Sequence, residues 1–137
     1  MNVGDISFRK NLSTIVLLGN YLPRQCGIAT FTTDLLNALI AESPESSIWA
    51  LAMNDIPEGY LYPNEVHFEI NQNNISEYKL ASDFLNFNRI DVVCVQHEYG
   101  IFGGKNGIYL LELLRNIHTP IVTTLHTVLE KPTQGER

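Results

Sequence analysis

The residues best suited to chemistry in this sequence are two histidines, each of which follows a short apolar run. His97 is followed directly by Glu98 and Tyr99, and then by a glycine-bearing stretch that ends at Gly104. An imidazole beside a carboxylate and a phenol can bind a hydroxyl-rich ligand or take part in acid–base chemistry. A single histidine is equally compatible with a hydrogen-bonded structural role. The glycines can let the backbone approach a ligand or simply let the loop turn.

The second histidine, His126, closes the last apolar run of the chain. If the two runs form neighbouring parallel strands, both histidines follow the carboxyl ends of strands, and we expect them to face one crevice. His97, Glu98 and His126 are residue types that bind zinc, but they lack the dense spacing of a metal motif, so we expect no metal site. Taken alone, His126 also fits a structural role.

A polar loop between positions 19 and 30 precedes the first expected helix. Gly27 stands at the start of that helix, where free backbone N–H groups and the positive end of the helix dipole suit a phosphate. The same glycine can instead serve only a tight turn. Arg24 can pair with an anion or lie solvated in the loop. Neither the GxGxxG fingerprint of dinucleotide sites nor a Walker A motif is present.

Short apolar runs that predict buried strands alternate with amphipathic stretches that predict helices. Their order, β-α-β-β-α-β-α-β, favours a Rossmann-like, doubly wound α/β fold. Residues 1–137 are expected to form one such domain. Its sheet is expected to be mainly parallel, with helices on both faces. The strands are expected at 13–19, 47–53, 66–70 (an edge strand), 90–95 and 120–125, and the helices at 28–43, from 75 onward and at 108–117.

Composition narrows the possible partners and locations. Nine Lys and Arg residues against 15 Asp and Glu give a net charge of −6, which argues against nucleic acid as a partner, because phosphate binding needs clustered cations. No apolar run is long enough to span a bilayer, and the N-terminus lacks a signal-peptide pattern. The helix from Ile75 carries few cations, so we expect no strong binding to anionic membranes. Two cysteines make no disulfide framework, and we expect a reducing, cytoplasmic location.

The end of the sequence carries a helix-start signal. Thr133 and Glu136 have capping-box spacing, but the sequence stops at Arg137. A frayed tail would explain this pattern. We expect instead that the 137-residue chain is the front part of a longer protein.

Three motifs occur in order along the chain: PRQCGIATFT from Pro23, QHEYGIFGG from Gln96 and TTLHT from Thr123. Together they resemble the N-terminal part of GT-B-fold glycosyltransferases of family 4, and within it a bacterial mannosyltransferase-like subgroup. The resemblance covers residues 14–136. It implies one half of a GT-B fold and the transfer of a sugar from a nucleotide-sugar donor to an acceptor hydroxyl, with retention at the anomeric carbon. No cofactor beyond the donor substrate is implied.

The resemblance also implies roles for single residues. The glycine loop matches the loop that approaches the donor pyrophosphate, and the last histidine matches one that contacts the donor sugar as a positioning group in catalysis. The loop after the fourth strand matches an acceptor-facing loop. The residues concerned are Gly27 and Ile28 for the donor phosphate, His126 for catalysis, and Arg24, His97, Glu98 and Tyr99 for the substrate.

The chain departs from the family pattern in two respects. The usual paired glycines are here Cys26 and Gly27, and the donor-binding domain with its Glu-x7-Glu motif is not in this sequence. We therefore expect the partner to be a C-terminal transferase domain or a separate subunit, and the isolated chain to be inactive. Two alternatives remain: a non-catalytic α/β module that binds a sugar or nucleotide, and a small hydrolase using His97 and Glu98. The hydrolase lacks a nucleophile elbow.

Overall fold

The structure is a computed structural model, and it describes residues 13–136. Its elements follow the expected order, with three short 3-10 turns added. The sheet consists of β1 (Thr14–Gly19), β2 (Ser47–Asn54), β3 (Val66–Asn71), β4 (Val92–His97) and β5 (Ile121–Leu125). The helices are α2 (Gly27–Glu42), α3 (Ile75–Phe87) and α4 (Leu110–Leu114), and the 3-10 turns are Tyr99–Ile101, Lys105–Gly107 and Gln134–Glu136.

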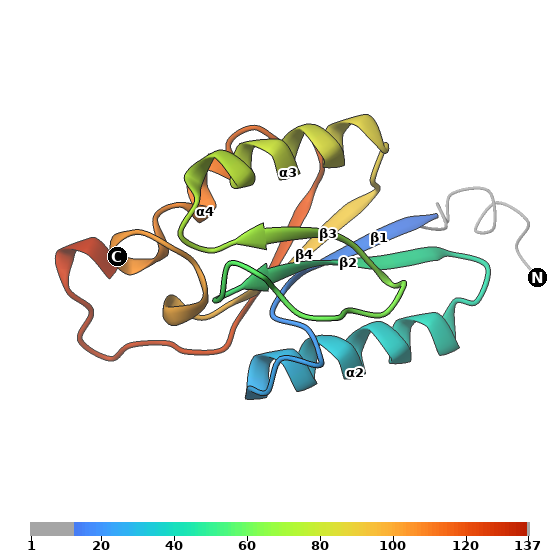
Figure 1. The fold of residues 1–137 in the computed structure, drawn as a ribbon, viewed down its shortest axis with the longest axis horizontal. Coiled ribbons are helices and arrows are strands. Elements are labelled where there is room, and N and C mark those ends of the chain that lie inside the picture. Colours follow the sequence, from blue (N-terminus) through green and yellow to red (C-terminus); the bar gives the residue numbers. More distant parts are fainter. Residues whose placement is uncertain (1–12, 137) are drawn as a thin grey trace, which may run out of the picture.

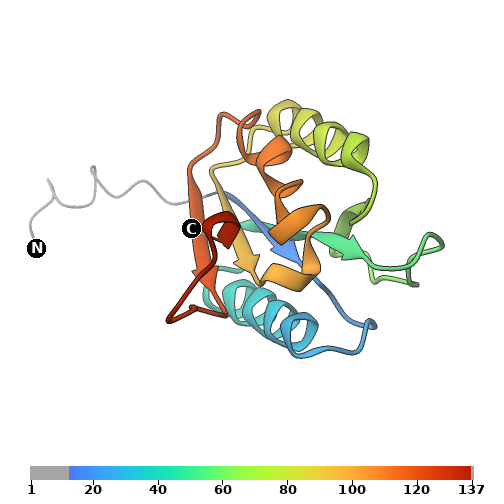
Figure 2. The ribbon, with the colours of Figure 1, turned by 90° about the vertical axis from the view of Figure 1, so that its left-hand side faces the viewer.

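The five strands form one parallel sheet in the order β3-β2-β1-β4-β5. Helix α2 covers one face, and α3 and α4 cover the other (Figures 1 and 2). The predicted Rossmann-like, doubly wound α/β fold is therefore confirmed, as is the edge position of β3. The chain runs outward from β1 to β3 and then returns to β4, so the strand order reverses between β1 and β4. Ligands in such sheets bind at the carboxyl ends of the strands beside that reversal.

The two faces of the sheet carry separate apolar cores. Along β1, Val16 and Leu18 pack toward α3 and α4, whereas Ile15 and Leu17 pack toward α2. All four side chains are buried. Continuous apolar runs in the sequence arise from this burial on both faces.

Strand β4 begins two residues later than predicted. Arg89 adopts a left-handed backbone with φ of 53°, and the Asp91 carboxylate accepts hydrogen bonds from the N–H groups of Ser13 and Thr14. Ile90 is buried between these two turn features rather than paired in the ladder. At the other end the strand continues through Gln96 to His97, which places both side chains on the sheet itself.

The third helix is shorter than predicted. Asn106 and Gly107 have φ values of 56° and 78°, so a 3-10 turn precedes Ile108 and the α-helical part starts only at Leu110. The capping-box pair near the end of the sequence forms one 3-10 turn, in which the N–H of Thr133 donates to the Glu136 carboxylate at 2.7 Å. No helix within residues 13–136 is long and apolar enough to cross a membrane.

Candidate functional site

His97 lies at the carboxyl end of β4, where its side chain faces the side of the sheet that α4 covers. Its ring stacks on Phe102, with centroids 6.0 Å apart, and meets the ring of Tyr99 edge-on at 5.2 Å. Its Nδ1 atom is buried and has no hydrogen-bond partner among residues 13–136. An unpaired polar atom in such a place is unfavourable unless something else pairs with it.

A pocket of about 450 Å³ opens beside His97. Leucines of α4 and β5 form its apolar wall, and Tyr99 and Lys105 add polar groups. The 3-10 turn at Gln134–Glu136 lies against it, because the Tyr99 hydroxyl donates to the Glu136 carbonyl oxygen at 3.1 Å. A concave, mostly apolar site with a few polar groups is the usual form of a small-molecule pocket. The lining residues are His97, Tyr99, Lys105, Asn106, Gly107, Ile108, Leu110, Leu111, Leu114, Thr123, Leu125, Gly135 and Glu136.

Burial lowers the pKa of His97 below its usual value, and proximity to His126 lowers it further, while the Glu98 carboxylate acts in the opposite direction. The imidazole is therefore neutral at pH 7. A neutral imidazole has one N–H donor and one acceptor nitrogen, so it can exchange hydrogen bonds with a hydroxyl group in either direction.

The other two residues predicted in this loop already have protein partners. The Glu98 carboxylate accepts a hydrogen bond from the N–H of Gly100 at 3.0 Å and caps the 3-10 turn. The Tyr99 hydroxyl donates a hydrogen bond to the carbonyl oxygen of Glu136. Their assignment as substrate-binding residues stays a prediction.

Gly103 lies in the loop that follows β4, where the chain packs closely against another segment. A Cβ atom there would lie 1.8 Å from the carbonyl oxygen of Gln72, so only glycine fits. Its backbone N–H is also in use, because it donates a hydrogen bond to the Tyr78 hydroxyl at 2.9 Å. This glycine therefore serves packing of the loop against the end of β3 rather than approach to a ligand.

His126 lies on the opposite face of the sheet from His97. Its ring meets Phe31 of α2 edge-on at 4.7 Å, and its Nε2 atom lies 3.0 Å from Oε1 of Gln96. A backbone hydrogen bond connects the two histidines, in which the N–H of His126 donates to the carbonyl oxygen of His97. The β4–β5 register pairs His97 with Leu125, and because side chains of successive residues point to opposite faces, His126 points to the other face. The expectation that both histidines face one crevice is therefore wrong.

Gln96 is a residue of this region that sequence reasoning missed. Its side chain is 1% exposed and lies over Gly19, where an added Cβ would come within 3.1 Å of it. Its Oε1 atom pairs with His126, whereas Nε2 has no partner among the described residues. The signal was available: a glutamine ends an otherwise apolar run immediately before His97.

Gly27 is the first residue of α2, as predicted for a phosphate-binding helix start. Cys26 caps the helix, with its Sγ accepting from the N–H of Ala29 at 3.4 Å. A Cβ atom on Gly27 would meet nothing within 4 Å, so open space lies in front of it. The Ile28 side chain packs against the core on the α3 side, and only its backbone N–H remains to face a ligand.

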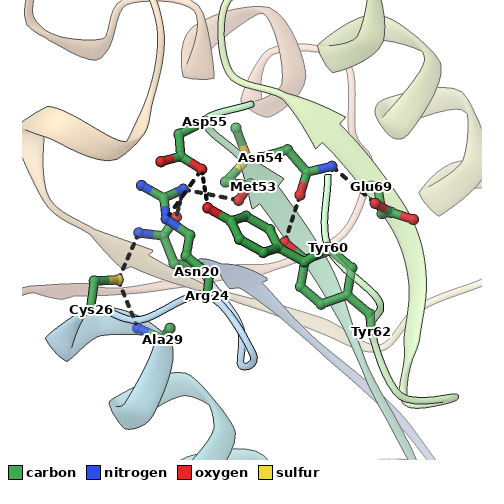
Figure 3. Close-up of polar contacts among 10 residues, drawn as sticks. All are labelled: Asn20, Arg24, Cys26, Ala29, Met53, Asn54, Asp55, Tyr60, Tyr62 and Glu69. Carbon is green, nitrogen blue, oxygen red and sulfur yellow. Dashed lines mark hydrogen bonds and ion pairs between the residues drawn. The ribbon is translucent and has the colours of Figure 1, made fainter. Parts of the chain in front are cut away.

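Arg24 belongs to a polar network at the carboxyl ends of β1 and β2 (Figure 3). Its guanidinium donates to Asn20 Oδ1 at 3.0 Å and to the carbonyl oxygen of Met53 at 3.1 Å, and it lies 3.7 Å from Asp55. Its side chain is 12% exposed. A hydrogen bond from Tyr60 is the main cause that lowers the pKa of Asp55, and Arg24 adds to it. Arg24 thus holds protein groups together here.

Within the described residues, no group of three or more His, Cys, Asp or Glu side chains is arranged to hold a metal ion. Comparison with known proteins adds no relative: no family model, no curated protein and no solved structure matches the chain.

Proposed function

We propose that this chain is the acceptor-side domain of a retaining glycosyltransferase, which moves a sugar from a nucleotide-sugar donor to an acceptor hydroxyl. The proposal rests on the three motifs that resemble family 4. It is supported by the parallel α/β sheet and by the position of all three motifs at the carboxyl ends of strands β1, β4 and β5. In a two-domain enzyme of this kind, that edge of the sheet faces the cleft.

The observation that carries the proposal is the unpartnered Nδ1 of His97 beside a pocket. We assign this imidazole to the acceptor: it is neutral at pH 7 and pairs with one hydroxyl of the glycan or other hydroxyl-bearing acceptor. The hydrogen bond orients that hydroxyl for transfer. Glu98 and Tyr99 hold the loop that follows His97.

The donor is assigned to the α2 side of the same edge. The N–H groups of Gly27 and Ile28 face its diphosphate, with the helix dipole favouring the negative charge. His126, held by Gln96, positions the donor sugar. A C-terminal transferase domain or a partner subunit supplies the cations for the diphosphate, and the isolated chain is inactive. No nucleic acid, further cofactor or strong membrane contact is part of this function.

Binding of methyl α-mannoside to the isolated chain tests the acceptor assignment. We expect the backbone amides of residues 97–107 to shift in NMR spectra, and we expect the His97→Ala variant to bind about tenfold more weakly. His118→Ala is the matched control, because that histidine is exposed, follows α4 and does not line the pocket. Equal binding by wild type and His97→Ala would remove His97 from the site.

The alternative is a non-catalytic α/β module or partner subunit that binds a sugar or nucleotide. One observation favours it: the guanidinium of Arg24, the cation nearest to Gly27 in sequence, is already held by Asn20, Met53 and Asp55. The downstream reading frame separates the two functions. A continuation or adjacent frame with a Glu-x7-Glu motif supports the transferase, and transfer of radiolabelled sugar by the isolated chain would contradict its predicted inactivity.

A further inference from the structure

A second pocket, of about 460 Å³, lies on the other face of the sheet, between α2 and the segment that joins β2 to β3. It is distinct from the His97 pocket and shares no lining residue with it. Glu65 lines it, and the Oε2 atom of that carboxylate is buried with no hydrogen-bond partner among residues 13–136. A buried carboxylate oxygen without a partner is unfavourable, and the residue that carries it lines the pocket.

The walls around Glu65 are aromatic and apolar. Tyr21 is 2% exposed and belongs to the core on the α2 face, and Tyr62 packs against the same core. The Glu65 charge lies close enough to Tyr21 to raise the pKa of that phenol, although burial is the larger cause. Aromatic faces beside a carboxylate favour a cation.

Several hydrogen-bond donors in the pocket walls are already used, whereas the exposed Asn37 amide, which also lines the pocket, makes no hydrogen bond within residues 13–136. The Thr33 hydroxyl donates to the carbonyl oxygen of Ala29 at 2.8 Å, and the Tyr62 hydroxyl donates to Asn54. The N–H of Leu22 donates to Thr33. Two further lining residues are prolines, which have no N–H group, and no lining residue is Lys, Arg or His.

We propose that this pocket binds the ammonium group of a small organic cation, with Glu65 as its counter-ion. A primary ammonium has three N–H donors and a positive charge, which matches a site that has a carboxylate and no cationic side chain in its lining. The apolar part of the ligand packs against Tyr21 and Tyr62. A neutral sugar fits less well, because it would leave the Glu65 carboxylate without a counter-ion.

The test uses n-butylammonium as the probe and the full 137-residue chain, followed by NMR. We expect the amides of Leu22, Thr33 and Glu65 to shift in wild type, and binding to weaken about tenfold in the near-isosteric Glu65→Gln variant. Glu58→Gln, an exposed carboxyl in the same β2–β3 segment, is the control and should bind as wild type does. Asn37→Phe places bulk at the pocket from an exposed position on α2 and should also abolish binding.

Two neutral probes complete the design. The proposal predicts no shift of these amides with n-butanol or methyl α-mannoside. Equal binding of butanol and butylammonium, unchanged affinity in Glu65→Gln, or a Glu65-dependent response to the mannoside alone would each overturn it. The proposal is independent of the glycosyltransferase assignment, since the acceptor test reads the amides of residues 97–107.

Discussion

The regions at the carboxyl ends of β1 and β4 each combine a glycine with a nitrogen-bearing side chain, and they use the two in opposite ways. In the loop after β1, the charged side chain is committed, because Arg24 pairs with Asn20, Met53 and Asp55, while Gly27 borders open space. In the loop after β4, Gly103 is committed to packing on Gln72, while His97, the last residue of β4, keeps an unpaired nitrogen. A residue type alone therefore does not identify a site. In the proposed function, the groups assigned to ligands are those whose bonding or space the fold leaves unused.

The largest expected difference in stability is between alanine variants of the two glycines, Gly103 and Gly27. Gly103→Ala forces a Cβ to within 1.8 Å of a carbonyl oxygen, and we expect the free energy of unfolding to fall by about 3 kcal/mol. Gly27→Ala meets no neighbour and should leave it unchanged within about 0.5 kcal/mol. Urea denaturation of both variants measures the difference. Similar stabilities for the two would contradict the contrast between the loops.

Removal of the committed cation should have the next largest effect. Arg24→Met takes a donor from Asn20 and from the Met53 carbonyl oxygen and leaves both in a partly buried network, so we expect a loss of about 2 kcal/mol. The exposed Asp55 contact adds little to this figure. His97→Gln breaks no hydrogen bond of the ring and should cost less. Denaturation at pH 7.5 compares the free energies of unfolding of the two variants. A larger loss of stability in His97→Gln would contradict the view that Arg24 is committed to the fold and His97 is not.

The smallest effect concerns pH. Burial lowers the folded-state pKa values of His97 and His67 below the ordinary value of about 6.5. The unfolded chain therefore binds protons more readily, and stability that is complete above pH 6.5 declines as the pH falls toward the lowered values. The melting temperature should drop between pH 7.5 and pH 5.5. His97→Gln should make this drop smaller, whereas the same change at exposed His118 should not; a steeper drop in His97→Gln would refute this.

The sequence was sufficient for the fold but not for the faces of the sheet. Continuous apolar runs located four strands, and alternation located the edge strand β3. Burial on both faces explains the apolar runs of β1 and β2, whereas β5 is exposed along its length. The apolar runs misplaced the start of β4, where the turn depends on Arg89 and on Asp91 bonding to a distant segment. The relative orientation of His97 and His126 depends on the register between β4 and β5, which no local pattern encodes.

The partners of the candidate residues were also beyond the sequence. Arg24 meets groups about thirty positions away at the end of β2, so its commitment to the network was not visible locally. Tyr21 and Glu65 approach each other only because β1 and β2 are neighbours in the sheet and the β2–β3 segment returns over α2. By contrast, the helix starts at Gly27 and Ile75 are local features, and both were predicted correctly.

The imidazole of His97 offers the most direct measurement of the proposed acceptor site. The ring nitrogens of the two histidines can be followed separately by ¹⁵N NMR during a titration with methyl α-mannoside at pH 7.5. We predict a shift of the His97 Nδ1 resonance as its nitrogen gains a hydroxyl partner, with the Nε2 resonance of His126 unchanged because Gln96 already pairs with it. A shift at His126 with none at His97 would contradict the assignment of the acceptor to the β4 loop.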